Sequence, residues 1–329
     1  MFLKLFKSIG PGGILLNIVI VSLLWIGSFI QECPSVFYYD ENPMPLYQLL
    51  LNIAGKPHQG TAFSFFFVLI VSFLIINLND SLFFIPERTY LPSFIYGFFS
   101  AFFVQYQKLN PVIPASLFLI YALKRIMDSY HKKGTAFSFF DASLLIGTGS
   151  LFYANLIWFG VIIVIGVIII RGYNLKELIL SVSGLAVPFI ITAGILYLLS
   201  IKPVSVIESL YDNLFRKMPD YGFSSVEIIA MIIAGLSVVT GIFFLLQNIR
   251  GMKIKSREIF ILLIWVFIIS VILFLFSPCA SAELIYIAAI PAVYFISYFL
   301  IYNKTKAIKE FVIAALFLSA ASIQILRYF

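Results

Sequence analysis

Two adjacent acids, Asp40 and Glu41, stand in a strongly apolar chain just after its first long hydrophobic run. They follow an aromatic triplet at 37–39, within the stretch QECPSVFYYDENPMPLY. A carboxylate that is partly withdrawn from water holds a proton more readily and can act as a general base. Adjacent residues of an extended loop point apart, so we expect the two acids to have different roles. The alternative is a solvated polar turn with an acidic cap.

Cationic side chains accompany these acids on two loops. Lys56 and His58 end the same loop, and Arg216 and Lys217 lie in a second long loop. Cations near the headgroup level of a membrane suit a phosphate or a pyrophosphate. For each of them taken alone, contact with lipid headgroups is the alternative.

The two cysteines and two histidines of the chain offer few metal ligands, so no metal site is predicted, and nothing in the pattern supports a divalent metal. Cys33 and Cys279 both fall just beyond a hydrophobic run, on the side predicted to be external. An oxidising compartment would permit a disulfide between them. The alternative is two unrelated buried thiols, and only their distance can decide.

The elements that must position these residues are membrane-spanning helices. The chain has 329 residues, of which 62% are hydrophobic and 11% charged, whereas soluble domains carry roughly a quarter charged residues. We predict an all-α polytopic membrane bundle, a single transmembrane domain over 1–329, with no internal repeat. Residues 139–171 form either a tight hairpin or one broken segment. The eleven expected spans are 14–31, 61–78, 90–106, 110–127, 139–153, 154–171, 179–200, 225–247, 259–276, 284–302 and 311–327.

The distribution of charge predicts the orientation. With a cytoplasmic N-terminus, sixteen of the 22 Lys and Arg residues fall on the inside and six on the outside, as the positive-inside rule requires. This bias also accounts for the net charge of +7, so membrane lipids rather than nucleic acid are the expected partners. The charge distribution predicts a multi-pass membrane protein, and the family resemblance given below implies a bacterial inner (plasma) membrane.

Two long loops lie on the predicted outer side, at 32–60 and 201–224. In the first, NPMPLYQLLLNIAG predicts an amphipathic helix, with Asn42 as its N-cap and Gly55 as its stop. The second loop contains a similar amphipathic segment. Helices of this kind lie in the membrane interface, and simple connectors are the alternative.

The stretch FYYDENP followed by LYQLLLNIAG resembles the first external loop of the GT-C superfamily of membrane glycosyltransferases. In that superfamily an acidic residue after the first span precedes membrane-parallel helices. The run from LNPVIPASLFLIY onward is similar to its middle spans. The chain as a whole also resembles a family of bacterial polytopic inner-membrane proteins without an established activity.

The resemblance implies a transfer of sugar from a polyprenyl-phosphate donor to a glycan, lipid or protein acceptor. Asp40 would be the base that activates the acceptor, with Glu41 as its alternative or partner. Lys56, His58, Arg216 and Lys217 would hold the donor phosphate. The chain departs from the superfamily in lacking a large C-terminal outer domain and a clear second acidic motif in a later outer loop.

Two other classes of function remain open. A transporter or flippase for a lipid-linked solute predicts charges inside the spans, and this sequence has few of them. A non-catalytic subunit of an envelope complex predicts a membrane protein partner and tolerance of substitutions at Asp40 and Glu41.

Overall fold

The computed structural model describes residues 11–31, 37–130, 136–172, 175–215, 222–280 and 282–326, and every regular element within these ranges is a helix. The first elements are α2 (Pro11–Ile30), α3 (Tyr38–Glu41), α4 (Pro45–Ala54), α5 (Pro57–Leu82), α6 (Leu91–Phe99), η1 (Val104–Tyr106) and α7 (Val112–Asp128). The middle elements are α8 (Ala136–Ser150), η2 (Ala154–Phe159), α9 (Gly160–Arg171), α10 (Leu175–Leu198) and α11 (Ser205–Phe215). The last are α12 (Ser225–Asn248), η3 (Ile249–Gly251), α13 (Ile254–Phe276), η4 (Ala282–Leu284), α14 (Ile285–Tyr302) and α15 (Lys306–Leu326).

Within the described residues, 7 helices are long and apolar enough to cross a membrane. They are α2, α5, α10, α12, α13, α14 and α15, and each coincides with an expected span. The all-α class is therefore confirmed, and the chain is a multi-pass membrane protein.

The other four expected spans correspond to shorter elements. Helix α7 has 17 residues and α8 has 15, whereas the expected span 154–171 is divided into η2 and the 12-residue α9. The only α-helix in the expected span 90–106 is α6, followed by the three-residue η1, and the nine residues of α6 cover about 14 Å of a hydrocarbon core of about 30 Å. The number eleven therefore stays a prediction. Residues 139–171 form two segments joined by a turn, which is the hairpin alternative.

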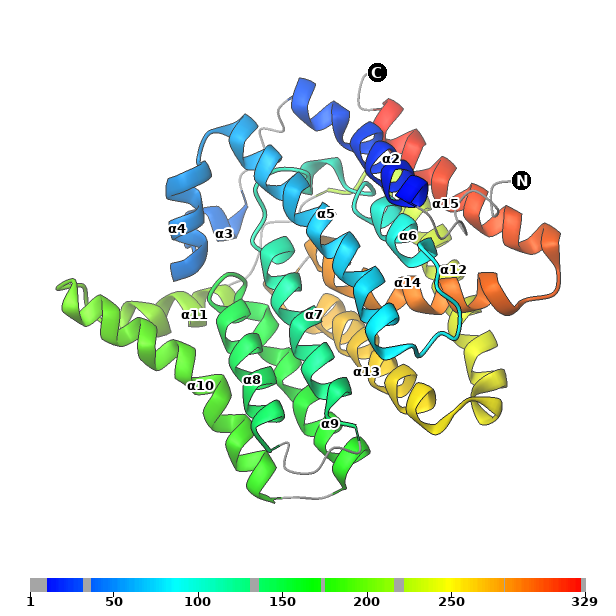
Figure 1. Cartoon of the computed structure of the whole chain (residues 1–329). Helices are drawn as coiled ribbons and strands as arrows, with labels where there is room; N and C mark the ends of the chain where they lie inside the picture. The colour runs from blue at the N-terminus through cyan, green and yellow to red at the C-terminus, as the bar shows by residue number, and fades with distance from the viewer. Residues whose placement is uncertain are drawn as a thin grey trace.

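Helix α14 is the centre of the bundle, with 89% of its apolar stretch buried. It packs against α6, α7, α12 and α13, and these helices surround it in Figure 1. The hydroxyl group of Tyr294 on α14 donates a hydrogen bond to the carbonyl of Ile75 on α5, at 2.7 Å. By contrast, only 17% of the apolar stretch of α10 is buried, and α10 and α11 project from one side of the bundle (Figure 1).

The irregular segment after α6 lies inside the protein, where its backbone carbonyls receive side-chain hydrogen bonds. Gln324 of α15 donates to the carbonyl of Ala101 at 2.9 Å. The Tyr286 hydroxyl lies 3.3 Å from the carbonyl of Tyr106, and Ser64 donates to the carbonyl of Lys108 at 2.7 Å. Non-helical backbone is tolerated at membrane depth only when it is satisfied in this way. Hydropathy alone cannot distinguish such a buried segment from a lipid-facing span.

Two short segments of the chain have the same local structure, although no internal repeat is predicted from the sequence. Residues 91–106 (the first repeat) and 141–156 (the second repeat) each form a helix, a turn and the start of a 3-10 helix. The backbone angles at the two turns nearly coincide, with φ −131° and ψ 102° at Phe103 and φ −130° and ψ 107° at Tyr153. Four of the sixteen aligned positions are identical: Ser93/Ser143, Gly97/Gly147, Ser100/Ser150 and Phe102/Phe152.

The turn ends of both repeats lie at the end of the bundle that carries α3 and α4, which we call the first-loop end. Lys108, just after the first repeat, contacts Asp40 of α3. The carbonyl of Leu151 in the second repeat accepts a hydrogen bond from the backbone of Leu46 in α4, at 3.0 Å.

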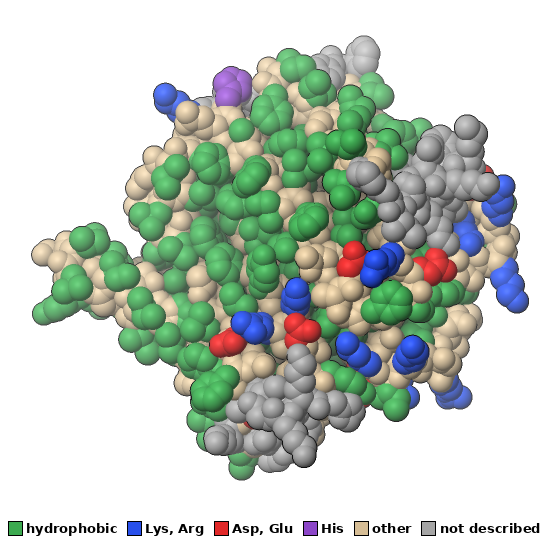
Figure 2. Space-filling view, in the orientation of Figure 1, with side chains coloured by type: hydrophobic (Ala, Val, Ile, Leu, Met, Phe, Trp, Pro, Cys, Tyr) green, Lys and Arg blue, Asp and Glu red, His purple; other side chains and the backbone are tan. Residues whose placement is uncertain are grey.

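On the face of the molecule in Figure 2, hydrophobic side chains cover the centre and left, and charged side chains gather in a band below and to the right.

The two loop helices are present. Helix α4 ends at Gly55, as expected, but its N-cap is Met44, and Asn42 instead ends α3. Asn42 precedes two prolines, Pro43 and Pro45, so the chain starts the helix only at the second of them. Tyr47 of α4 is fully buried, whereas the apolar side chains of Leu49 and Ile53 are exposed, which is typical of a helix in the membrane interface.

Candidate functional site

Asp40 is fixed within a single helical turn at the first-loop end. The turn, α3, begins after Phe37, and the backbone N–H of Phe37 donates to Asp40 Oδ2 at 3.2 Å. This contact satisfies one of the amide groups that a helix start leaves without a partner. The Asp40 side chain therefore caps the start of its own helical turn.

Two further side chains orient the carboxylate. Tyr47 of α4 donates to Oδ1 at 3.0 Å, and the Lys108 ammonium lies 2.9 Å from Oδ2. Lys108 also lies 4.3 Å from the centre of the Phe37 ring, a cation–π contact. The Asp40 side chain is 22% exposed. A carboxylate accepts about four hydrogen bonds, so the three donors among the described residues leave one acceptor position, on Oδ1.

Glu41 differs from Asp40 in its exposure, and both acids lie in the helical turn α3 rather than in the extended loop that was expected. It is exposed, whereas Asp40 is half-buried. The next residue, Asn42, accepts a hydrogen bond at its carbonyl from Asn213 of α11, at 2.8 Å. This contact joins the two long loops at 32–60 and 201–224.

The aromatic triplet of the first loop is held between the two repeats. The ring of Phe37 stacks on Tyr106 of the first repeat, with centroids 4.9 Å apart, and on Tyr39 at 5.2 Å. The hydroxyl group of Tyr38 donates to Tyr153 of the second repeat. The triplet thus anchors Asp40 to both repeats at once.

A second acid, Glu283, lies beside this triplet. Glu283 is in η4, between α13 and α14, and is 0% exposed. Its Oε1 accepts a hydrogen bond from the Tyr153 hydroxyl at 3.3 Å. Tyr38, Tyr153 and Glu283 are therefore connected by a continuous series of side-chain hydrogen bonds. An acid of a later loop therefore lies close to the first loop, although no clear acidic motif marks it in the sequence. A single acid among apolar residues forms no recognisable sequence motif. Only the folded structure brings Glu283 close to Tyr38.

Burial raises the pKa of the loop tyrosines well above its ordinary value of 10.0. For Tyr47 the charge of Asp40 adds to the effect of burial, and for Tyr38 Tyr153 and Glu283 add to it. These phenols therefore remain protonated donors at neutral pH. The pKa of Tyr39 is raised in the same direction, mainly by burial, and its hydroxyl has no hydrogen-bond partner among the described residues.

The cations predicted from the sequence to lie near Asp40 do not include the one that contacts it. The cation that pairs with Asp40 is Lys108, which the sequence analysis did not select. Lys56 and His58 are exposed where α4 passes into α5. Arg216 and Lys217 lie outside the described residues, so their role as phosphate ligands stays a prediction.

The disulfide between Cys33 and Cys279 also stays a prediction, because Cys33 lies outside the described residues. Cys279 is buried, and its sulfur lies 3.5 Å from the carbonyl of Asp212. Across the described part of the chain, no three His, Cys, Asp or Glu side chains gather as a metal site would require.

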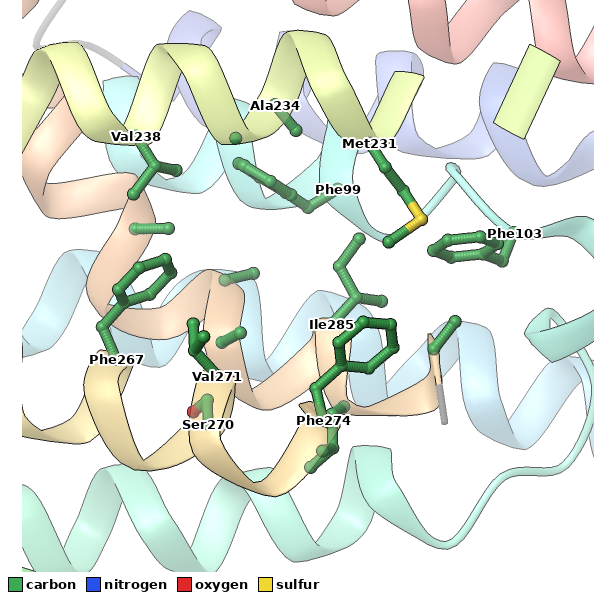
Figure 3. Close-up of a pocket in the computed structure, with 16 residues that line it drawn as sticks. Phe99, Phe103, Met231, Ala234, Val238, Phe267, Ser270, Val271, Phe274 and Ile285 are labelled. Atoms are coloured by element: carbon green, nitrogen blue, oxygen red, sulfur yellow. The ribbon is translucent and has the colours of Figure 1, made fainter. Parts of the chain in front are cut away.

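An apolar groove of about 170 Å³ reaches the loop of Glu283 from the side of the bundle. Its walls come from α12, α13 and α14, and Figure 3 shows Met231, Phe267 and Phe274 around it. Ala282 and Leu284, the two neighbours of Glu283, line one part of it together with Phe103 of the first repeat. The groove could take an alkyl chain.

The arrangement is that of a multi-pass helical membrane protein with a polar, aromatic-rich site at one end. Residues 44–328 match the model of DUF6427, which is described as a family of unknown function, and the chain belongs to this family. No curated protein matches the chain, and no solved structure matches it.

Proposed function

We propose that the protein is a GT-C-like glycosyltransferase at the outer face of a bacterial inner membrane. It would move a sugar from a polyprenyl-phosphate donor to an envelope glycan, lipid or protein acceptor. The observation that carries the proposal is the Asp40 carboxylate, which is part-exposed, oriented by three donors, and placed in the loop that follows the first span. The acceptor position that the described donors leave on Oδ1 suits the hydroxyl of an incoming acceptor.

In this reaction Asp40 removes the proton of the acceptor hydroxyl while the acceptor oxygen attacks the anomeric carbon of the sugar. The bond from that carbon to the phosphate oxygen breaks, and the polyprenyl phosphate leaves with the electron pair. Attack from the face opposite the phosphate inverts the anomeric carbon. The groove of Figure 3 would hold part of the polyprenyl chain, and Lys56, His58, Arg216 and Lys217 are the candidate phosphate ligands.

The test is glycan profiling of the envelope by mass spectrometry, in the wild type, a deletion strain and strains with single substitutions. Asp40→Asn retains the size of the side chain but removes its basicity, so a sugar should be missing in this strain and in the deletion. Glu41→Gln is the matched control, because Glu41 is exposed, and this strain should retain the sugar. Unchanged glycans in the deletion strain would refute the proposal.

One observation favours the flippase alternative. Transporters often contain repeated units with interrupted helices, and the first and second repeats are both interrupted at the same position. If the deletion strain lacks a glycan but the Asp40→Asn strain does not, the protein moves the lipid-linked sugar or supports a partner that acts on it. The long exposed face of α10 would suit a membrane protein partner.

A further inference from the structure

A cluster of cations lies at the end of the bundle opposite the first-loop end, where α12 passes into α13 (Figure 1). Helix α13 ends shortly before Glu283, which contacts Tyr153 at the first-loop end, so the start of α13 lies at the opposite end. We call residues 250–257 the basic segment. Four of its eight residues are Lys or Arg and none is acidic; the cations are Arg250, Lys253, Lys255 and Arg257.

Three of these cations have no acidic partner among the described residues, unlike another cation at the same end. Arg125, near the end of α7, lies 3.8 Å from the carboxylate of Asp141 in α8. By contrast, within the described part of the chain no acid forms an ion pair with Arg250, Lys253 or Lys255. The positive charge of the basic segment is therefore available to a negatively charged partner.

Exposed apolar side chains continue from the basic segment along both helices. Arg250 and Lys253 are themselves exposed. Leu246, about one turn before Arg250, is 50% exposed, and Ile254, directly after Lys253, is 58% exposed. Trp265, about three turns further along α13, lies on the same side of the helix as Ile254 and is 41% exposed. The cations thus stand at the edge of an apolar surface, which matches the headgroup and the acyl chains of a lipid.

We infer that the basic segment binds the phosphate of an anionic phospholipid, whose acyl chains lie along the exposed apolar side chains of α12 and α13. Clusters of Lys and Arg next to a membrane-spanning helix attract anionic headgroups, so charge complementarity selects this class of lipid over a zwitterionic one. A lipid fits better than free phosphate, because the apolar surface begins directly beside the cations. The positive-inside rule requires cations at this end, but it does not require them to gather in one segment without acids.

The inference does not depend on the proposed transferase activity, and the quenching of tryptophan fluorescence by brominated lipids tests it. The purified full-length protein is placed in vesicles of phosphatidylglycerol and phosphatidylcholine, with bromine in the acyl chains of one lipid or the other. Of the three tryptophans, Trp25 is 0% exposed, and Trp158→Phe removes the other exposed ring, so Trp265 reports on the lipid at this surface. We expect the anionic lipid to bind there about fivefold more tightly than the zwitterionic one, as one charge near a membrane surface implies.

Two double variants of the Trp158→Phe protein complete the experiment. Arg250→Gln with Lys253→Gln removes two exposed cations of the basic segment and should lower the preference for the anionic lipid to less than about twofold. Lys304→Gln with Lys306→Gln is the matched control, because it removes two exposed cations from the turn between α14 and α15 and should leave the preference unchanged.

Three results would overturn the inference. The first is equal binding of the two lipids before any cation is replaced. The second is a preference that survives the loss of Arg250 and Lys253, and the third is an equal loss of preference in both double variants, which would show only a diffuse attraction to this end of the bundle. All four replaced side chains are exposed, so both double variants should retain the fold.

Discussion

Two neighbouring tyrosines of the first-loop end, Tyr39 and Tyr47, differ in the hydrogen bonding of their hydroxyl groups. The hydroxyl of Tyr47 donates to Asp40, whereas the hydroxyl of Tyr39 has no partner among the described residues. Both side chains are at most 3% exposed, and their rings are in edge contact, with centroids 5.9 Å apart. A comparison of the two residues therefore separates the contribution of a hydrogen bond to stability from the contribution of burying an aromatic ring.

Removal of the two hydroxyl groups should have unequal effects. Tyr47→Phe takes a donor from a half-buried carboxylate, so we expect the free energy of unfolding to fall by about 1–2 kcal/mol. Tyr39→Phe removes a polar atom that has no partner, so the change should stay within about 0.5 kcal/mol. Denaturant titration of both variants in mixed micelles measures the difference. Equal losses would mean that Tyr47 does not support Asp40 as the geometry indicates.

At the scale of elements, glycine lets α8 and α10 approach closely. A Cβ atom on Gly147 of α8 would lie 2.6 Å from the carbonyl oxygen of Leu185 in α10, and one on Gly184 of α10 would lie 2.6 Å from that of Phe140 in α8. Small residues at contacts between membrane helices allow such packing, which there replaces the hydrophobic effect. Each helix thus supplies the small residue that the backbone of the other needs.

Replacing each of two glycines in α8 and α10 by alanine should change the free energy of unfolding in opposite directions. Gly147→Ala must push the α10 backbone away, and we expect a loss of about 1–3 kcal/mol in the free energy of unfolding. Gly194→Ala is the control, because nothing lies within 4 Å of the added Cβ, and the higher helix propensity of alanine should stabilise it by up to about 1 kcal/mol. Thermal unfolding of both variants in detergent gives the comparison. A neutral Gly147→Ala would show that the two helices are not in close contact.

At the scale of the whole molecule, each end of the bundle carries an exposed lysine that can report which side of the membrane that end faces. Lys56 lies at the first-loop end, at the start of α5, and Lys253 lies at the opposite end, before α13. Both side chains are exposed. The positive-inside rule predicts that the first-loop end faces outward.

Cysteine labelling of intact cells tests this orientation. A membrane-impermeant maleimide should label Lys56→Cys but not Lys253→Cys, and should label both after the cells are opened. The wild type provides the background from its own two cysteines. Labelling of Lys253→Cys in intact cells would reverse the orientation and place Asp40 on the cytoplasmic side, which would also contradict a transferase at the outer face.

The sequence by itself determined the class of the protein and most of its long helices, because the hydrophobicity of a span is a property of one continuous segment. The bounds of α4 were also largely predictable, since Pro45 and Gly55 punctuate it. The short α6 was not, because a segment buried in protein is as apolar as one that faces lipid. The similar local structure of 91–106 and 141–156 was not recognised either, since four identities in sixteen positions give no clear signal in the sequence.

The tertiary structure alone decided which polar groups meet. Lys108 reaches Asp40 across 68 positions, Tyr153 reaches Glu283 across 130, and Gln324 reaches Ala101 across 223. In a soluble protein the boundary between polar and apolar faces indicates which sides of helices pack together. In this chain the spans are apolar on nearly every side, so only the packing of the whole bundle selects these contacts.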